Sequence, residues 1–274
     1  MKKVLAFAMA ALMASALFVG CGSDPAATSG SGEAPSNTDT NKITITQPSD
    51  LDGLKIGVQG GTTGESYVQD NVKDAKLSSF NSGMDAALDL KNGGVDAVVL
   101  DELPAKAIVE QNPDLTIVDV GLSKEDYAIA VKKGNKELLD SINKTIKRIK
   151  EDGTYQKLTD AFMPSDGKII IPETKLTAGS KILKMGTNAA FKPFEYVDGT
   201  EPVGFDVSLS QEIAADYGAK LQVEDMKFDS LISALTTGQV DFVAAGMTVN
   251  PERLENVDFS DSYYTSNQVV IIKK

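Results

Sequence analysis

The chain has 274 residues, enough for one or two domains, and 42% of them are hydrophobic, so a folded globular protein is expected. It carries 39 acidic and 27 basic residues, and the net charge of -12 argues against a nucleic-acid partner, because phosphate binding needs a positive surface field. The sequence has no histidine, which excludes His-ligated metal sites and the imidazole form of a Ser or Cys triad.

The N-terminus has the pattern of a secretory signal, with two lysines and then an apolar run from Val4 to Val19. The ending Phe18-Val19-Gly20-Cys21 resembles a bacterial lipobox, which predicts a lipoprotein signal peptide over residues 1–20 and lipidation of Cys21. The alternative is an ordinary signal peptide with an unrelated cysteine. We expect residues 21–42 to be a disordered tether, because residues 22–42 hold no large apolar side chain.

From residue 43 the pattern alternates between strands and helices. Strands are predicted at 54–58 and 97–100, and a capping box at Ser82 opens a helix between them that Gly93 stops. A helix over 102–111 and strands over 115–120 and 127–132 follow. We therefore expect an α/β lobe over residues 43–127.

The next segment is predicted to be helical and then to change to a linker. An amphipathic helix, N-capped by Asn135, runs to Lys150, and a shorter helix covers 154–162. We assign 128–163 to a hinge strand with closing helices, and the Gly- and Pro-containing segment 164–181 to a linker.

The second half repeats the first. Residues 235–241 (LTTGQVD) match 90–96 (LKNGGVD), with a helix end, a glycine stop and the start of a buried strand in the same order. A hairpin is expected at Asp198-Gly199. Residues 182–274 are therefore expected to form a second α/β lobe that ends in a hinge strand.

Five motifs carry a resemblance to a known family. In order they are FKPFEY at 191–196, VGFDV at 203–207, FDSLISAL at 228–235, AGMTVNPER at 245–253 and VDFSDSYY at 257–264. They resemble the first lobe of the polar amino-acid-binding proteins of ABC importers, whereas VQGGTT at 58–63 and VVLDELP at 98–104 resemble the second lobe. The resemblance implies a two-lobed periplasmic-binding-protein-like fold with a ligand cleft between the lobes. It also implies a free amino acid as ligand, an ABC transporter permease as partner and no cofactor.

The order of the lobes differs from that of the family. The family's Phe-x-Pro-Phe lobe comes first, whereas here it follows the Gly-Thr-Thr lobe, as in a circular permutant. We therefore expect only one covalent hinge strand, near 128–133, with 268–273 pairing beside it as a free end.

The chemistry of a zwitterionic ligand assigns roles to the residues of these motifs. It needs a planar cation for the carboxylate, an anion for the ammonium and apolar walls. Arg253 is the predicted carboxylate partner; the alternative is a solvated first helical turn with Glu252. Thr248 and Gly246 are expected to add a hydroxyl and a close backbone approach.

Asp101 is the predicted partner of the ligand ammonium, because it follows a strand at the carboxyl end where open α/β sheets bind ligands. The alternative is that Asp101 only caps the next helix. Thr63 is expected to donate its hydroxyl and N–H to the ligand carboxylate. Phe191 and Phe228 are expected to sandwich the aliphatic part of the ligand, or else to pack in the core.

Two amide side chains bear on specificity. The resemblance places Asn188 where relatives that bind basic or amide side chains tend to carry an aspartate, with Gln59 in the loop that faces it. Since an asparagine offers no charge to a ligand cation, we predict a polar, uncharged ligand side chain.

The predicted site draws on both lobes, so only a closed state lets a ligand touch all of it. We expect a monomeric, lipid-anchored, extracytoplasmic solute-binding protein without enzymatic activity. The alternatives are an exported cyclohexadienyl/arogenate-type dehydratase, in which a cleft carboxylate acts as general acid, and a sensor ectodomain.

Overall fold

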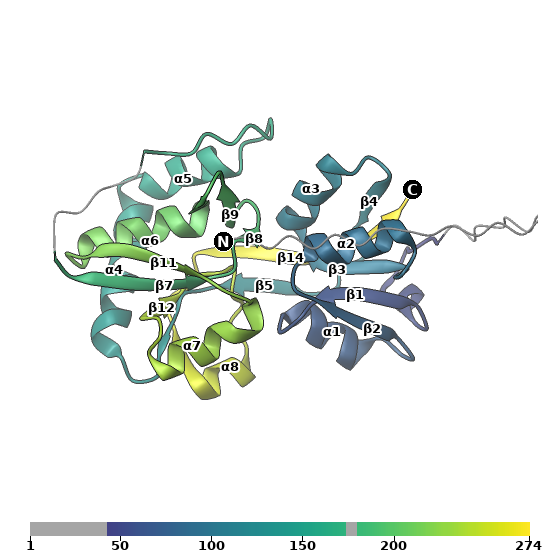
Figure 1. Cartoon of the computed structure of the whole chain (residues 1–274), viewed down its shortest axis with the longest axis horizontal. Helices are drawn as coiled ribbons and strands as arrows, with labels where there is room; N and C mark the ends of the chain where they lie inside the picture. The colour runs from purple at the N-terminus through teal and green to yellow at the C-terminus, as the bar shows by residue number, and fades with distance from the viewer. Residues whose placement is uncertain (1–42, 174–179) are drawn as a thin grey trace, which may run out of the picture. The chain divides into compact units, whose positions relative to one another are not determined.

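The computed structural model describes residues 43–173 and 180–274 (Figure 1). The expected signal peptide, tether and Cys21 lie outside the described residues, as does part of the expected linker. Within these two ranges, no helix has both the length and the apolar character that a membrane span needs.

The first α/β unit is built on a six-stranded sheet that carries the α-helices α1, α2 and α3. Its strands have the order β2-β1-β3-β14-β4, and β5 pairs with β14 beside them. The predicted helix that starts after Ser82 is confirmed, since the Ser82 Oγ accepts from the Asp85 N–H at 3.1 Å and Gly93 ends the helix with φ of 81°. The elements are η1 (Pro48–Leu51), β1 (Lys55–Gln59), α1 (Thr63–Asn71), β2 (Lys76–Phe80), α2 (Gly83–Asn92), β3 (Ala97–Asp101), α3 (Glu102–Gln111) and β4 (Leu115–Val118).

The second unit is built around a sheet of order β11-β7-β12-β6-β13, with a small sheet β10-β9-β8 beside it. The hairpin expected at Asp198-Gly199 is confirmed, because Asp198 pairs with Glu201 in antiparallel register. The elements are β6 (Ala130–Lys132), α4 (Lys136–Glu151), α5 (Thr154–Phe162), β7 (Ile182–Thr187), β8 (Ala190–Phe191), β9 (Glu195–Asp198), β10 (Glu201–Val203), α6 (Phe205–Asp216), β11 (Lys220–Asp225), η2 (Phe228–Ser230), α7 (Leu231–Thr237), β12 (Phe242–Val243), α8 (Pro251–Asn256) and β13 (Val257–Phe259).

The two large sheets repeat one arrangement. In the first, β1 lies between two parallel neighbours, and the antiparallel β14 separates β3 from β4. In the second, β7 lies between its parallel neighbours β11 and β12, and the antiparallel β6 separates β12 from β13. The sequence repeat therefore corresponds to a repeated sheet topology.

Two strands cross between the units. One is β5 (Lys124–Tyr127), which leads into β6, and the other is β14 (Tyr264–Lys273). They pair antiparallel over Lys124–Tyr127 and Tyr264–Asn267. Figure 1 shows β14 running from the unit that holds β7 into the one that holds β3.

The expectation that residues 268–273 pair beside the strand near 128–133 is wrong. Residues 268–273 continue the strand that begins at Tyr264, so the chain crosses between the units twice. They pair on both sides, with β3 and with β4, and so join these two strands in one sheet. Without them, β3 and β4 would each have an unpaired edge.

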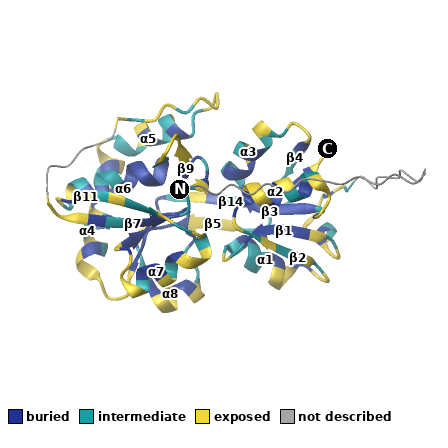
Figure 2. Ribbon diagram, in the orientation of Figure 1, coloured by how far each residue is buried: buried dark blue, intermediate teal, exposed yellow. Residues whose placement is uncertain are grey.

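The core forms where the sheets meet their helices. Figure 2 shows β3 and most of β7 as buried. The predicted apolar face of α4 is confirmed, since Leu138, Ile142, Ile146 and Ile149 are all buried. Burying a side chain of this size stabilises the fold by about 1.5–3 kcal/mol, which anchors α4 against α6.

Candidate ligand-binding site

A small pocket lies between the two units, near the carboxyl ends of β1 and β3 and around the loop after β12. The free volume inside it is about 20 Å³, room for a water molecule, so the two walls stand close together. All nine residues predicted from the sequence line this pocket, and the prediction missed three more. The lining residues are Gln59, Thr62, Thr63, Asp101, Asn188, Phe191, Glu195, Phe228, Ala245, Gly246, Thr248 and Arg253.

Arg253 is the cation of the pocket. The Asn250 side chain caps α8 by accepting from the Arg253 N–H at 2.8 Å, which fixes the start of its side chain. The guanidinium donates to the Thr248 carbonyl at 2.6 Å and, across the units, to the Gly61 carbonyl at 2.9 Å. Its carbon lies 5.4 Å from the centroid of the Phe228 ring.

The alternative of a solvated first turn at Arg253 is wrong, because the residue is only 6% exposed. Burial lowers the pKa of Arg253, while the charges of Glu125 and Asp101 raise it. A guanidinium stays charged at neutral pH and has five N–H donors, of which the two carbonyls take two. Arg253 therefore has N–H groups left that can donate hydrogen bonds to a carboxylate.

Asp101 is the acid that the first unit contributes, at the end of β3. It accepts hydrogen bonds from the Tyr127 hydroxyl and from the Gln268 amide. It occupies the N-cap position of α3 but its side chain makes no capping bond, so the capping alternative is wrong. The pKa of Asp101 is raised to about 7, mainly by burial. The hydrogen bond from Tyr127 lowers this pKa, and the negative charge of Glu125 raises it. A ligand ammonium would favour its charged form.

The loop before α1 supplies further polar groups. The Thr63 hydroxyl donates to Glu125 at 2.7 Å, so its predicted donation to a ligand would require that bond to break. Thr62, which the sequence analysis did not select, accepts from the Glu65 N–H and donates to the Gln59 carbonyl. An N-cap threonine at a Gly-rich turn is the signal that could have identified it.

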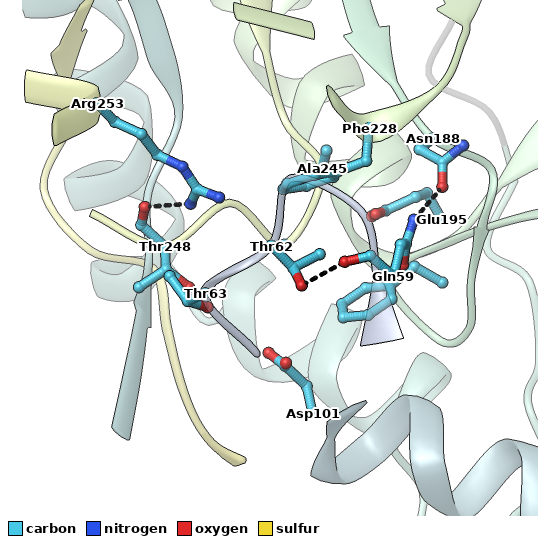
Figure 3. Close-up of a pocket in the computed structure, with 12 residues that line it drawn as sticks. Gln59, Thr62, Thr63, Asp101, Asn188, Glu195, Phe228, Ala245, Thr248 and Arg253 are labelled. Carbon is cyan, nitrogen blue, oxygen red and sulfur yellow. Dashed lines mark hydrogen bonds between the residues drawn. The ribbon is translucent and has the colours of Figure 1, made fainter. Parts of the chain in front are cut away.

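Gln59 and Asn188 meet across the units, as Figure 3 shows. The Gln59 amide donates to the Asn188 side-chain oxygen at 2.8 Å, and the Asn188 amide donates to the Met226 carbonyl at 2.8 Å. With the bond from Arg253 to Gly61, this contact holds the two walls together in a closed arrangement.

Aromatic rings form the apolar wall. Phe191 packs on Phe194 with ring centroids 5.9 Å apart and on Tyr127 at 6.5 Å. Gly246 has φ of 52°, and a Cβ there would lie 2.7 Å from the Phe191 ring, so only glycine fits. Phe191 belongs to the large buried core and Phe228 packs against a second one, so both rings pack in the core and line the pocket.

Glu195 is the most unusual residue of the pocket, and the sequence analysis missed it. It is fully buried, and its carboxyl group forms a side-chain hydrogen bond with the carboxyl group of Asp206, which requires one of the two acids to hold a proton. Burial, followed by the charge of Asp206, raises the pKa of Glu195 well above its ordinary value. Asp206 is also fully buried, and it accepts from the Gly246 N–H at 2.9 Å and from the Tyr263 hydroxyl at 2.6 Å. An acid inside the apolar run 191–196 is the signal that could have identified Glu195.

Comparison with known proteins gives a family match over most of the chain. The model of the bacterial extracellular solute-binding proteins, family 3, matches residues 7–165 and 183–274. The arginine-binding extracellular protein ArtP of Bacillus subtilis is 53% identical over 97 residues, covering 35% of this chain and 38% of the relative. The ABC transporter arginine-binding protein 1 of Escherichia coli is 38% identical over 120 residues, covering 42% and 49%. The chain thus spans less than half the length of these two relatives.

A solved structure is similar over part of the chain. It is the Phe57Trp mutant of domain 1 from TmArgBP in its arginine-bound form, which is 39% identical to this chain with a TM-score of 0.31. The match covers 34% of this chain and 78% of that chain.

Proposed function

Because the chain belongs to family 3 of the bacterial extracellular solute-binding proteins, we propose that it captures a free amino acid in the described pocket and delivers it to the permease of an ABC importer. The observation that carries this proposal is a buried cation and a buried acid that face one pocket from different units. Arg253 comes from the second unit and Asp101 from the first. The matched relatives are named for arginine binding, which supports an amino acid as the ligand.

The mechanism follows from where the two groups sit. The α-carboxylate of a ligand would pair with Arg253 and its ammonium with Asp101, and both pairs are strong where water is excluded. An amino acid is larger than the free volume of the pocket, so the units must separate to admit it and close again around it. Contacts made only in the closed state shift the equilibrium towards closure, which presents a different surface to the permease.

The proposal makes the pocket a binding site and not a catalytic one. The family consists of solute-binding proteins, so the dehydratase alternative is not retained. Isothermal titration calorimetry with the twenty standard L-amino acids tests the proposal, with binding of at least one at micromolar affinity or better as the expected result. No binding across the whole panel would refute it.

Anchoring and lobe order remain part of the proposal. Lipidation at Cys21 is supported by the lipobox-like Phe18–Cys21 segment, and Cys21→Ser is expected to release the protein from the membrane fraction. A permuted lobe order is supported by the reversed order of the motifs and by the match of the family model in two segments. We also propose that the protein acts as a monomer.

The side-chain class of the ligand is the remaining question. The prediction of an uncharged polar side chain depends on Asn188 alone. Glu195, which that reasoning did not consider, lies in the same pocket, and together with the relatives named for arginine binding it favours a positively charged ligand side chain.

A further inference from the structure

We propose that Asp206, which does not line the pocket, is a positioning residue for ligand binding: its carboxylate holds the loop 245–248 in place and ties it to the crossing strand β14. This inference rests on the proposed function, because it treats the pocket as an amino-acid site. The role concerns the frame of the pocket, independently of which amino acid it holds.

Asp206 lies in the first turn of α6, behind the wall of the pocket. Its N–H donates to the Phe194 carbonyl at 2.9 Å, so the helix begins directly on the segment that leads into Glu195. The Asp206 side chain is fully buried. The first turn of a helix stabilises a negative charge, so a buried acid at this position can be ionised.

The Asp206 carboxyl group receives hydrogen bonds from three parts of the fold. One of its oxygens accepts from the Gly246 N–H at 2.9 Å and from the Tyr263 hydroxyl at 2.6 Å. The bond with Glu195 raises the pKa of Glu195 and lowers that of Asp206, so Glu195 holds the proton and donates. Burial raises the pKa of Asp206 to about 6 although all three bonds lower it, so Asp206 is a carboxylate at neutral pH.

The bond to Gly246 fixes a loop that carries ligand-facing groups. Gly246 and Thr248 both line the pocket, and the Thr248 carbonyl accepts from the guanidinium of Arg253. A backbone hydrogen bond anchors the loop at the Met247 carbonyl, whereas at Gly246 the anchor is the side chain of Asp206. Without the carboxylate, this end of the loop is free to move, and Thr248 and Arg253 move with it.

The bond to Tyr263 ties the same loop to the strands that cross between the units. Tyr263 directly precedes β14, and its N–H donates to the Tyr127 carbonyl of β5, the other crossing strand, at 2.9 Å. Its ring stacks on that of Phe205 with centroids 6.0 Å apart. Asp206 therefore bonds both to the pocket loop and to the start of a crossing strand, which links the geometry of the pocket to the opening of the units.

A carboxylate buried beside a second acid lowers the stability of the fold at neutral pH. Further acids surround the pair. The titratable groups that act on it from the elements packed around it are Asp101 on β3, Asp225 on β11, Tyr127 on β5, Tyr155 on α5 and Tyr263 before β14. Such perturbed acids cluster at functional sites. The proposed role thus differs measurably from a structural one, because removing the charge should preserve stability and still weaken binding.

The experiment measures binding and thermal stability of the same variants at pH 8, where Asp206 and Asp101 are both ionised. Asp206→Asn keeps the shape of the side chain, and Asp216→Asn, an exposed position at the other end of α6, is its matched control. Tyr263→Phe removes one donor to Asp206 without changing a charge. Its control is Tyr155→Phe, because the Tyr155 hydroxyl donates to the Tyr263 carbonyl. The probe for titration calorimetry is the standard L-amino acid that the wild type binds most tightly.

At pH 8, Asp206→Asn should bind the probe about 10- to 100-fold more weakly than the wild type, with an equal or higher thermal midpoint. Tyr263→Phe should weaken binding about 3- to 10-fold, and both controls should bind as the wild type does. At pH 5, where the wild-type Asp206 holds a proton, the wild type and Asp206→Asn should bind within about threefold of each other. Asp101 is present in both proteins, so its own titration cancels from this ratio.

Unchanged binding by Asp206→Asn at pH 8, or an equal loss at pH 8 and pH 5, would overturn the role of Asp206 and leave the proposed function intact. A loss that Tyr263→Phe does not share would show that the charge acts on the ligand directly, which also overturns positioning. A thermal midpoint that falls together with the affinity would show a merely structural role. If the wild type binds none of the standard amino acids, the proposed function itself fails, and this role fails with it.

Discussion

Arg253 offers the sharpest test of how the pocket binds its ligand. Replacing it with alanine removes the only basic side chain that lines the pocket of the described structure. A ligand carboxylate would then be desolvated without a partner, which costs about 2–5 kcal/mol, or about 30- to 4,000-fold in affinity. The variant also loses the bond to the Gly61 carbonyl, which helps to hold the units closed.

Arg253→Lys separates charge from geometry. Lysine keeps the positive charge but cannot give two parallel hydrogen bonds, so we expect a loss between that of the alanine variant and none. The matched control is Arg148→Ala on α4. Arg148 pairs with Asp152, Glu212 and Asp216 and does not line the pocket, so this variant should bind normally. Titration calorimetry with L-arginine and a thermal melt of each variant make the measurement. Affinity of Arg253→Ala within threefold of wild type would refute the assignment of the carboxylate site.

Three further predictions concern the acids and the glycine of the site. The pKa of Asp206 is raised from 3.8 to about 6, so the folded state holds a proton that the unfolded state has lost, and Asp206 should lower the free energy of unfolding by roughly 3 kcal/mol as pH rises from about 4 to about 6, in addition to the falls that Asp101 and Glu195 cause. Asp206→Asn should flatten this fall in denaturant titrations, and an unchanged slope would contradict the assignment. Asp101→Asn should weaken amino-acid binding at least tenfold at pH 8 and much less at pH 5, where the wild-type carboxyl is itself protonated; equal loss at both values would count against its role. Gly246→Ala should lower the thermal midpoint more than Gly238→Ala, because both have positive φ but only Gly246 lies against an aromatic ring. Equal shifts would show that the Phe191 contact is unimportant.

Local signals predicted some elements to the residue. The helices at 102–111 and 154–162 were expected with the bounds that the structure shows. Helix α6 was not predicted, because its first six residues are all buried, and a helix buried on every side has no polar face and therefore no helical period in its hydrophobicity. Strand β2 was not predicted either, because it is a polar edge strand in which no residue is fully buried.

The site shows the same division between local and tertiary information. All nine predicted residues converge because strand ends and the turns after them gather at one edge of each sheet. Glu195 was missed because its burial beside a second acid depends on tertiary contacts. Its sequence neighbours are aromatic, whereas the acid that makes it unusual, Asp206, is brought beside it by the packing of α6. No pattern within the hairpin indicates that this carboxyl would be buried against a second acid.

The two crossing strands also set how the protein folds and unfolds. The first sheet is incomplete without β14, which lies between β3 and β4. The hydrogen bond from the Gln268 amide to Asp101 joins residues that are 167 positions apart. A ladder of such long sequence separation forms late and slowly, because a large loop must be closed before its contacts stabilise anything. Residues 43–118 taken alone would lack the strand that lies between β3 and β4, so we expect the two halves to depend on each other for stability and to unfold together.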